Sequence, residues 1–143
     1  MPVYQTRFEI NAPATRVWEV LTDFRSYPQW NPQIPWASGS IEDGARIQLR
    51  LALPGRPAMD LSAVIEQARP CELLTWRGHV GAPWFFEGYR KFEIQPIAAA
   101  RVRVTHVEDV HGLAAPVFAV VMGGPVARSQ RALNDALRVR AER

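Results

Sequence analysis

The chain has 143 residues, 17 basic and 14 acidic side chains, a net charge of +3 and 48% hydrophobic residues. This composition argues against a disordered chain, and we expect one domain over residues 1–143 and no nucleic-acid partner. Cys71 is the only cysteine, so the fold has no intramolecular disulfide. No run reaches the roughly 18 apolar residues of a membrane span. We therefore expect a cytoplasmic protein without stable membrane insertion.

The N-terminal segment alternates between apolar and polar side chains over residues 3–10, which predicts a strand with one solvent-exposed face. Residues 11–13, Asn-Ala-Pro, are typical of a helix start, and we expect that helix to end near Asp23. Three prolines in residues 25–36 exclude a long helix there and leave room for one short helical turn.

The middle of the chain has the period of two that is typical of half-buried strands. Turn residues such as Glu42-Asp43-Gly44 separate its alternating segments. These segments are residues 47–53, 59–66, 74–77, 84–94 and 101–110. We count about seven strands in all, and because they follow one another directly, we expect an antiparallel sheet with one apolar face.

The last segment, residues 112–143, is the longest helical candidate. From Val126 to Leu137 apolar residues recur every three or four positions, while charged residues fill the other side. Gly123-Gly124-Pro125 interrupts the apolar run that precedes this stripe, because proline lacks a backbone donor and clashes with the preceding turn. We expect a kink or a junction of two helices there, and it is a candidate hinge.

Four stretches carry a family resemblance over nearly the whole chain. They are INAPATRVWEVLTDFRSYPQWNP at residues 10–32, LTWRG at 74–78, FEIQP with VTHVED within 92–109, and LNDALRVRAE at 133–142. Together they resemble the START-like superfamily, also called SRPBCC, and within it the bacterial polyketide cyclase/dehydrase and lipid-transport proteins. The motifs are specific in combination and none is diagnostic alone.

This resemblance implies an α+β helix-grip fold. In that fold a curved antiparallel sheet of about seven strands surrounds a long C-terminal helix, and two short helices follow the first strand. The helix then roofs a cavity for a hydrophobic or amphipathic ligand. Gly123-Gly124-Pro125 departs from the more continuous helix of many relatives.

His106 and Glu108 stand two residues apart on a predicted strand, so both point to its inner face, as does Arg90 on the strand before. Buried titratable groups are costly unless they meet a partner or a ligand. Three roles stay open for them: an anchor for a ligand's polar group, an acid–base pair, or a structural network. His79 and His111 have no cysteine or carboxylate at metal-ligand spacing, so we expect no metal and no cofactor.

The predicted ligand-binding residues are large apolar side chains of the strands, of the proline-rich segment and of the C-terminal helix, together with the three polar ones. They are Trp30, Leu49, Leu61, Trp76, Phe86, Arg90, Phe92, His106, Glu108, Phe118 and Met122.

The leading hypothesis is a binding or transfer protein for a hydrophobic or amphipathic, lipid-like or polyketide-like small molecule, with no catalytic step. An alternative is a small cyclase or dehydratase that uses His106 and Glu108 as acid and base. A third is a partner-binding module, which predicts a filled core and an exposed apolar patch. A homodimer is compatible with all three.

Overall fold

The computed structural model describes residues 3–143, which form seven strands, three α-helices and one 3-10 turn. The strands are β1 (Val3–Ile10), β2 (Trp36–Ser38), β3 (Arg46–Leu51), β4 (Met59–Arg69), β5 (Leu73–His79), β6 (Glu87–Ala98) and β7 (Arg101–His111). The helical elements are α1 (Ala14–Thr22), the 3-10 turn η1 (Phe24–Ser26), α2 (Tyr27–Trp30) and α3 (Ala115–Ala141).

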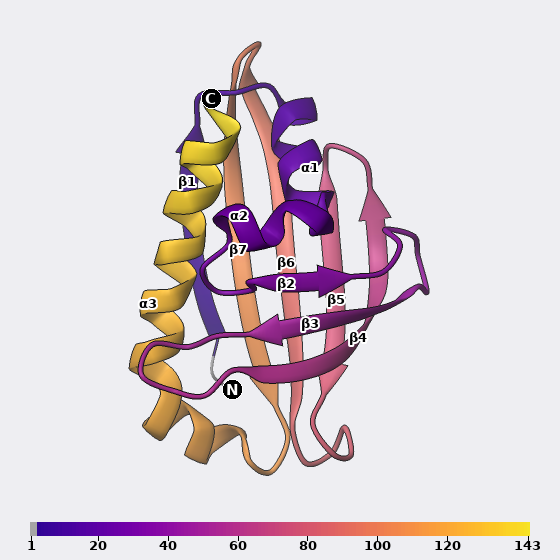
Figure 1. Cartoon of the computed structure of the whole chain (residues 1–143), viewed down its shortest axis with the longest axis vertical. Helices are drawn as coiled ribbons and strands as arrows, with labels where there is room; N and C mark the ends of the chain where they lie inside the picture. The colour runs from indigo at the N-terminus through magenta and orange to yellow at the C-terminus, as the bar shows by residue number, and fades with distance from the viewer. Residues whose placement is uncertain (1–2) are drawn as a thin grey trace.

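All seven strands belong to one antiparallel sheet in the order β1-β7-β6-β5-β4-β3-β2. The sheet is strongly curved, so that β2 and β3 cross in front of the long strands β5 to β7, and α3 runs along the side of β1 (Figure 1). The predicted helix-grip architecture is therefore confirmed, including the two short helices after the first strand.

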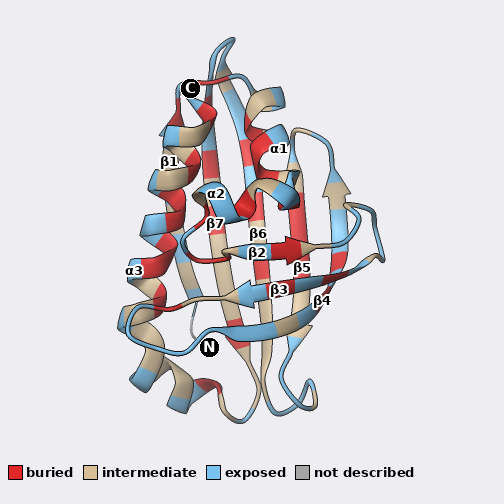
Figure 2. Ribbon diagram, in the orientation of Figure 1, coloured by how far each residue is buried: buried red, intermediate tan, exposed pale blue. Residues whose placement is uncertain are grey.

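The core lies between the inner face of this sheet and the helices. Strand residues such as Ile10, Ile65 and Val104 are fully buried, and so are Val17 of α1 and Leu133 of α3. Figure 2 shows this buried band along the sheet and along the C-terminal part of α3. The hydrogen bond from the backbone N–H of Asn11 to a Glu142 carboxylate oxygen, 2.8 Å long, ties the end of β1 to the end of α3.

Several strand boundaries differ from the prediction. β6 starts at Glu87 instead of residue 84, because Ala82 O accepts hydrogen bonds from the N–H groups of Phe85 and Phe86 and holds this segment in a turn. β5 runs from Leu73 to His79 instead of over residues 74–77, and β3 ends at Leu51 instead of residue 53. β4 and β6 continue beyond the predicted residues 66 and 94, to Arg69 and Ala98. β2, only three residues long and following three prolines, has too little alternation to be placed from the sequence.

Thr75 stands between Leu74 and Trp76, so alternation with these inward-facing residues predicts that it faces water, but it is buried. A register shift between Ile65 and Gln67 on β4 brings the backbone N–H of Gln67 within 3.1 Å of Thr75 Oγ1. The hydroxyl is therefore satisfied inside the fold, as a buried polar group needs to be.

The long helix α3 is continuous from Ala115 to Ala141 with Pro125 inside it, so of the two alternatives, a kink or a junction of two helices, the junction is ruled out. Its two parts nevertheless differ: buried residues recur from Val126 onward, whereas only Ala115 is buried before it. In Figure 1 the first turns of α3 bend away from the axis of the rest of the helix. A Cβ at Gly123 would come within 3.2 Å of the Tyr4 hydroxyl, so this glycine leaves room for the end of the Tyr4 side chain.

Within residues 3–143 no helix is long and apolar enough to cross a membrane.

Candidate functional site

A cavity of about 100 Å³ lies between the inner face of the sheet and the first half of α3. Strands β3 to β7, the segment before β2 and two residues of α3 form its wall. The lining residues are Ile34, Leu49, Leu51, Leu61, Ala63, Trp76, Gly78, His79, Val80, Phe86, Gly88, Tyr89, Arg90, Glu108, Asp109, Val110, Phe118 and Val126.

Two glycines belong to the wall, and they differ: Gly88 leaves open space, whereas a Cβ added at Gly78 would lie 2.8 Å from the backbone oxygen of Ser62 on β4. Gly78 of β5 and Gly88 of β6 are register partners on neighbouring strands. A Cβ added at Gly88 would meet no atom within 4 Å. A glycine inside a strand often marks a place where a ligand or another backbone comes close. Phe86 and Phe118 also belong to the wall, and their rings pack edge to face with centroids 4.9 Å apart.

The polar part of the wall is an ion pair. Arg90 on β6 and Glu108 on β7 are register partners, and Arg90 Nη2 lies 3.3 Å from Glu108 Oε2. Gln33 bridges the two: its Oε1 accepts a hydrogen bond of 2.6 Å from Arg90 Nη1, and its Nε2 donates one of 2.9 Å to Glu108 Oε1. The pair is therefore held by a third, fully buried side chain.

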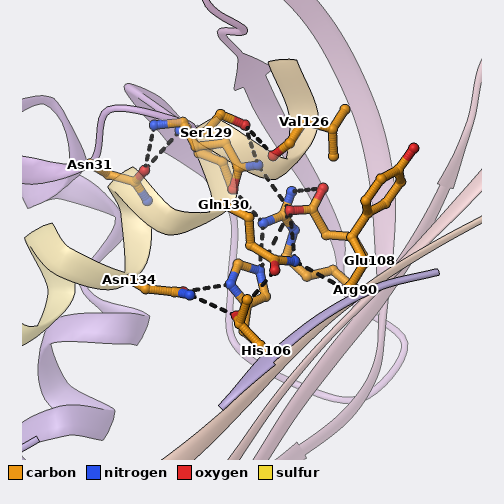
Figure 3. A network of polar contacts seen from close by, with 12 residues as sticks. Asn31, Arg90, His106, Glu108, Val126, Ser129, Gln130 and Asn134 are labelled. Carbon is orange, nitrogen blue, oxygen red and sulfur yellow. Dashed lines mark hydrogen bonds and ion pairs between the residues drawn. The ribbon is translucent and has the colours of Figure 1, made fainter. Parts of the chain in front are cut away.

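His106 lies beside this pair and has no exposed surface. Its Nε2 is 2.9 Å from Arg90 Nη1, and its Nδ1 is 2.8 Å from Asn134 Oδ1, as Figure 3 shows. Since a guanidinium can only donate, Nε2 is the acceptor and the proton is on Nδ1. Burial, together with the positive charge of Arg90, holds the pKa of His106 well below its usual range. The ring is neutral, and both of its nitrogens are engaged.

Polar side chains of α3 complete the network (Figure 3). Asn134 Nδ2 donates to Thr6 Oγ1 at 2.7 Å, and this hydroxyl donates to Gln130 Oε1 at 3.1 Å. Gln130 Nε2 lies 3.3 Å from Glu108 Oε1, and Ser129 Oγ accepts a 2.9 Å bond from Gln33. The network thus joins β1, β6, β7 and the segment before β2 to the middle of α3.

Sequence reasoning missed Gln33, Gln130 and Asn134 as members of this site. For α3 a signal was available, since polar residues interrupt a stripe that is otherwise apolar, as Ser129 does between Val126 and Leu133. For Gln33, in a proline-rich segment without periodicity, no pattern indicates that the side chain is fully buried.

Seven of the eleven predicted ligand-binding residues line the cavity. They are Leu49, Leu61, Trp76, Phe86, Arg90, Glu108 and Phe118. The other four lie elsewhere. Phe92 is in the core, stacked on His106 with ring centroids 4.3 Å apart. His106 is likewise in the core, Trp30 packs edge-on against Tyr27, and Met122 is half-buried on α3 without reaching the wall.

In the part of the chain that the structure describes, no group of three or more histidine, cysteine, aspartate or glutamate side chains is placed to hold a metal ion.

A curved antiparallel sheet that holds one long helix over a small, mostly apolar cavity defines a START-like, helix-grip protein. The sequence model for the polyketide cyclase/dehydrase and lipid-transport family matches residues 1–142, and the chain belongs to this family. The comparison with curated proteins gave no match.

Solved structures share the fold at low sequence identity. The Zhui aromatase/cyclase from a Streptomyces species superimposes with a TM-score of 0.80 at 20% identity, over 99% of this chain and 94% of that one. A START superfamily protein from Mycobacterium smegmatis gives 0.77 at 20% identity, over 98% and 97% of the two chains. Norcoclaurine synthase from Thalictrum flavum gives 0.70 at 13% identity, over 96% and 84%.

Proposed function

We propose that this protein binds or transfers a hydrophobic or amphipathic small molecule, lipid-like or polyketide-like, in the cavity under α3, without a catalytic step. The proposal rests on the composition and shape of the cavity wall. Gly88 leaves open space at the inner face of the sheet, mostly apolar side chains surround that space, and the Arg90–Glu108 ion pair interrupts them. Ligand sites are built in this way, with apolar walls and few polar groups.

The size of the cavity bears on how a ligand enters. About 100 Å³ is less than the roughly 300 to 1,000 Å³ of pockets that take drug-sized molecules. A large ligand therefore has to displace part of the wall, and we infer that this part is Phe118 on the first half of α3. Val117 and Val120 beside it are 66% and 87% exposed. Pro125 also lacks the N–H that would tie this half to the rest of the helix.

The enzyme alternative receives less support from the geometry. His106 does not reach the cavity, and its acceptor nitrogen is taken by Arg90, so it cannot exchange a proton with a bound molecule unless the network opens. Glu108 alone of the proposed acid–base pair faces the cavity. The aromatase/cyclase and the synthase named above are enzymes, and a structure of that synthase holds dopamine and hydroxybenzaldehyde, so the fold accommodates small aromatic molecules.

A partner-binding module is the second candidate, because one specific observation favours it. The loop before β6 and the start of α3 expose several large apolar side chains at one end of the molecule: Val80, Trp84, Phe85, Leu113, Val117, Val120 and Val121. The two segments are joined by hydrogen bonds from the N–H groups of Leu113 and Ala114 to the carbonyls of Trp84 and Phe85. An exposed apolar surface of this kind fits either a partner or a movable cavity roof.

A titration with toluene, followed by protein NMR, tests the proposal. Toluene should shift the signals of the cavity wall, with Trp76 and Phe118 among them. In Gly88→Leu the new side chain fills the space that the glycine leaves open and should abolish the shifts. The matched control Val120→Leu adds one methylene on the surface and should bind as the wild type does. Equal shifts in Gly88→Leu and the wild type, or none in the wild type, would reject the cavity as the site.

A further inference from the structure

The polar wall of the cavity carries no net charge. Arg90 and Glu108 compensate each other at 3.3 Å, and both side chains are largely buried, with 9% and 14% exposed. Neighbouring groups add no charge to this balance: burial keeps the pKa of His106 low and raises that of the Tyr4 hydroxyl, so both stay uncharged near neutral pH.

The other polar residues of the wall do not aim a charged side chain at the centre of the cavity. Side chains alternate along a strand, so those of Tyr89 and Asp109 point to the outer face when Arg90 and Glu108 point inward. Tyr89 lies 4.8 Å from the guanidinium of Arg77, and Asp109 pairs with His111 at 3.1 Å. His79, at the end of β5, is exposed.

The ion pair can form further hydrogen bonds, both as a donor and as an acceptor. Arg90 Nη1 uses its two N–H groups on Gln33 and His106, while Nη2 has one contact, to Glu108. Glu108 Oε1 accepts from Gln33 and from Gln130, while Oε2 meets only Arg90. Of the five N–H groups of Arg90, one on Nη2 and the one on Nε thus have no acceptor among residues 3–143, and Glu108 Oε2 keeps one acceptor position. A hydroxyl group both donates and accepts, and it matches this wall.

We propose that the Arg90–Glu108 pair selects a ligand whose polar group is an uncharged hydroxyl, an alcohol or a phenol, over a carboxylate or an ammonium group. A carboxylate would be attracted by Arg90 but repelled by the adjacent Glu108. An ammonium group would be attracted by Glu108 but repelled by Arg90. Either would also lose its water in an otherwise apolar cavity, with no uncompensated charge to receive it. This inference rests on the proposed function and adds the chemical class of the ligand.

The experiment compares phenol, benzoate and benzylammonium, with toluene as the apolar reference, in NMR titrations of the wild-type protein at pH 7. The four probes share one ring and differ in the charge and hydrogen bonding of one group. Phenol is expected to bind more tightly than toluene and at least about tenfold more tightly than either ion. Benzoate or benzylammonium binding as tightly as phenol overturns the inference and leaves the proposed function intact. Failure of all four probes, toluene included, rejects the proposed function as well.

A protein variant with a changed charge in the cavity wall tests the same inference. Glu108→Gln keeps the shape of the side chain but leaves Arg90 uncompensated, so benzoate should gain at least about tenfold relative to phenol. Glu93→Gln is the matched control, because it removes the same charge from an exposed position on the same pair of strands, outside the cavity. An unchanged ratio of benzoate to phenol in Glu108→Gln contradicts the inference. The wild-type selectivity series decides the question even where this variant does not fold.

Discussion

The neutral, fully buried His106 makes the stability of the fold depend on pH in a defined window. In the unfolded chain this ring binds a proton below its ordinary pKa of 6.5, whereas in the folded protein burial and Arg90 keep it neutral to a much lower pH. The stabilisation is therefore complete above pH 6.5 and is lost as the pH falls. One proton taken up only by the unfolded state costs at most about 1.4 kcal/mol of stability per pH unit.

Urea unfolding at a series of pH values between 7.5 and 5.5 measures this slope. His106→Gln retains an acceptor and a donor but does not titrate, so its free energy of unfolding should fall less steeply than that of the wild type, whatever its absolute stability. Removing the exposed His79, by His79→Gln, should leave the slope close to that of the wild type. Parallel curves for the wild type and His106→Gln would refute the neutral, buried state of the ring.

Three further predictions concern stability and motion. Gly112→Ala should destabilise the fold by more than about 1 kcal/mol in thermal unfolding, because φ is +107° and a Cβ would lie 2.4 Å from Phe85 O, whereas Gly88→Ala meets open space and should cost less. Leu133→Ala, at a fully buried position, should cost about 2–5 kcal/mol in urea unfolding, and Val120→Ala, at an exposed one, within about 0.5 kcal/mol. Pro125→Ala restores a backbone donor and should slow amide hydrogen exchange over residues 115–122, while unchanged exchange there would argue against a hinge.

The fold was largely predictable because each of its main features has a local signal. Alternation marks β1, β4 and β7, and the three- and four-residue spacing marks α3 from Val126 onward. What the sequence does not encode locally is the curvature of the sheet and the turn at Ala82, which depend on contacts between distant segments. The continuity of α3 through Pro125 also has no local signal in the sequence. It depends on tertiary packing, because Val126 and the buried residues after it hold the helix in place.

The candidate site was predictable only in part. The inner faces of β6 and β7 follow from alternation, so Arg90 and Glu108 could be placed together. That His106 lies in the core instead of at the wall depends on the positions of Phe92 and Asn134, which come from different elements. The cavity borders Gly88, and which residues of the neighbouring strands lie beside this glycine is a matter of strand register. The cytoplasmic location, the single domain and the homodimer stay predictions.

The central claim is that the space under α3 holds a ligand, and a crystal structure of the protein purified from its own host cells tests it most directly. The account predicts electron density for a bound molecule between Trp76, Arg90 and Phe118, with Phe118 moved away from Phe86. An empty cavity of about 100 Å³, with the ring centroids of Phe118 and Phe86 still 4.9 Å apart, would contradict the account.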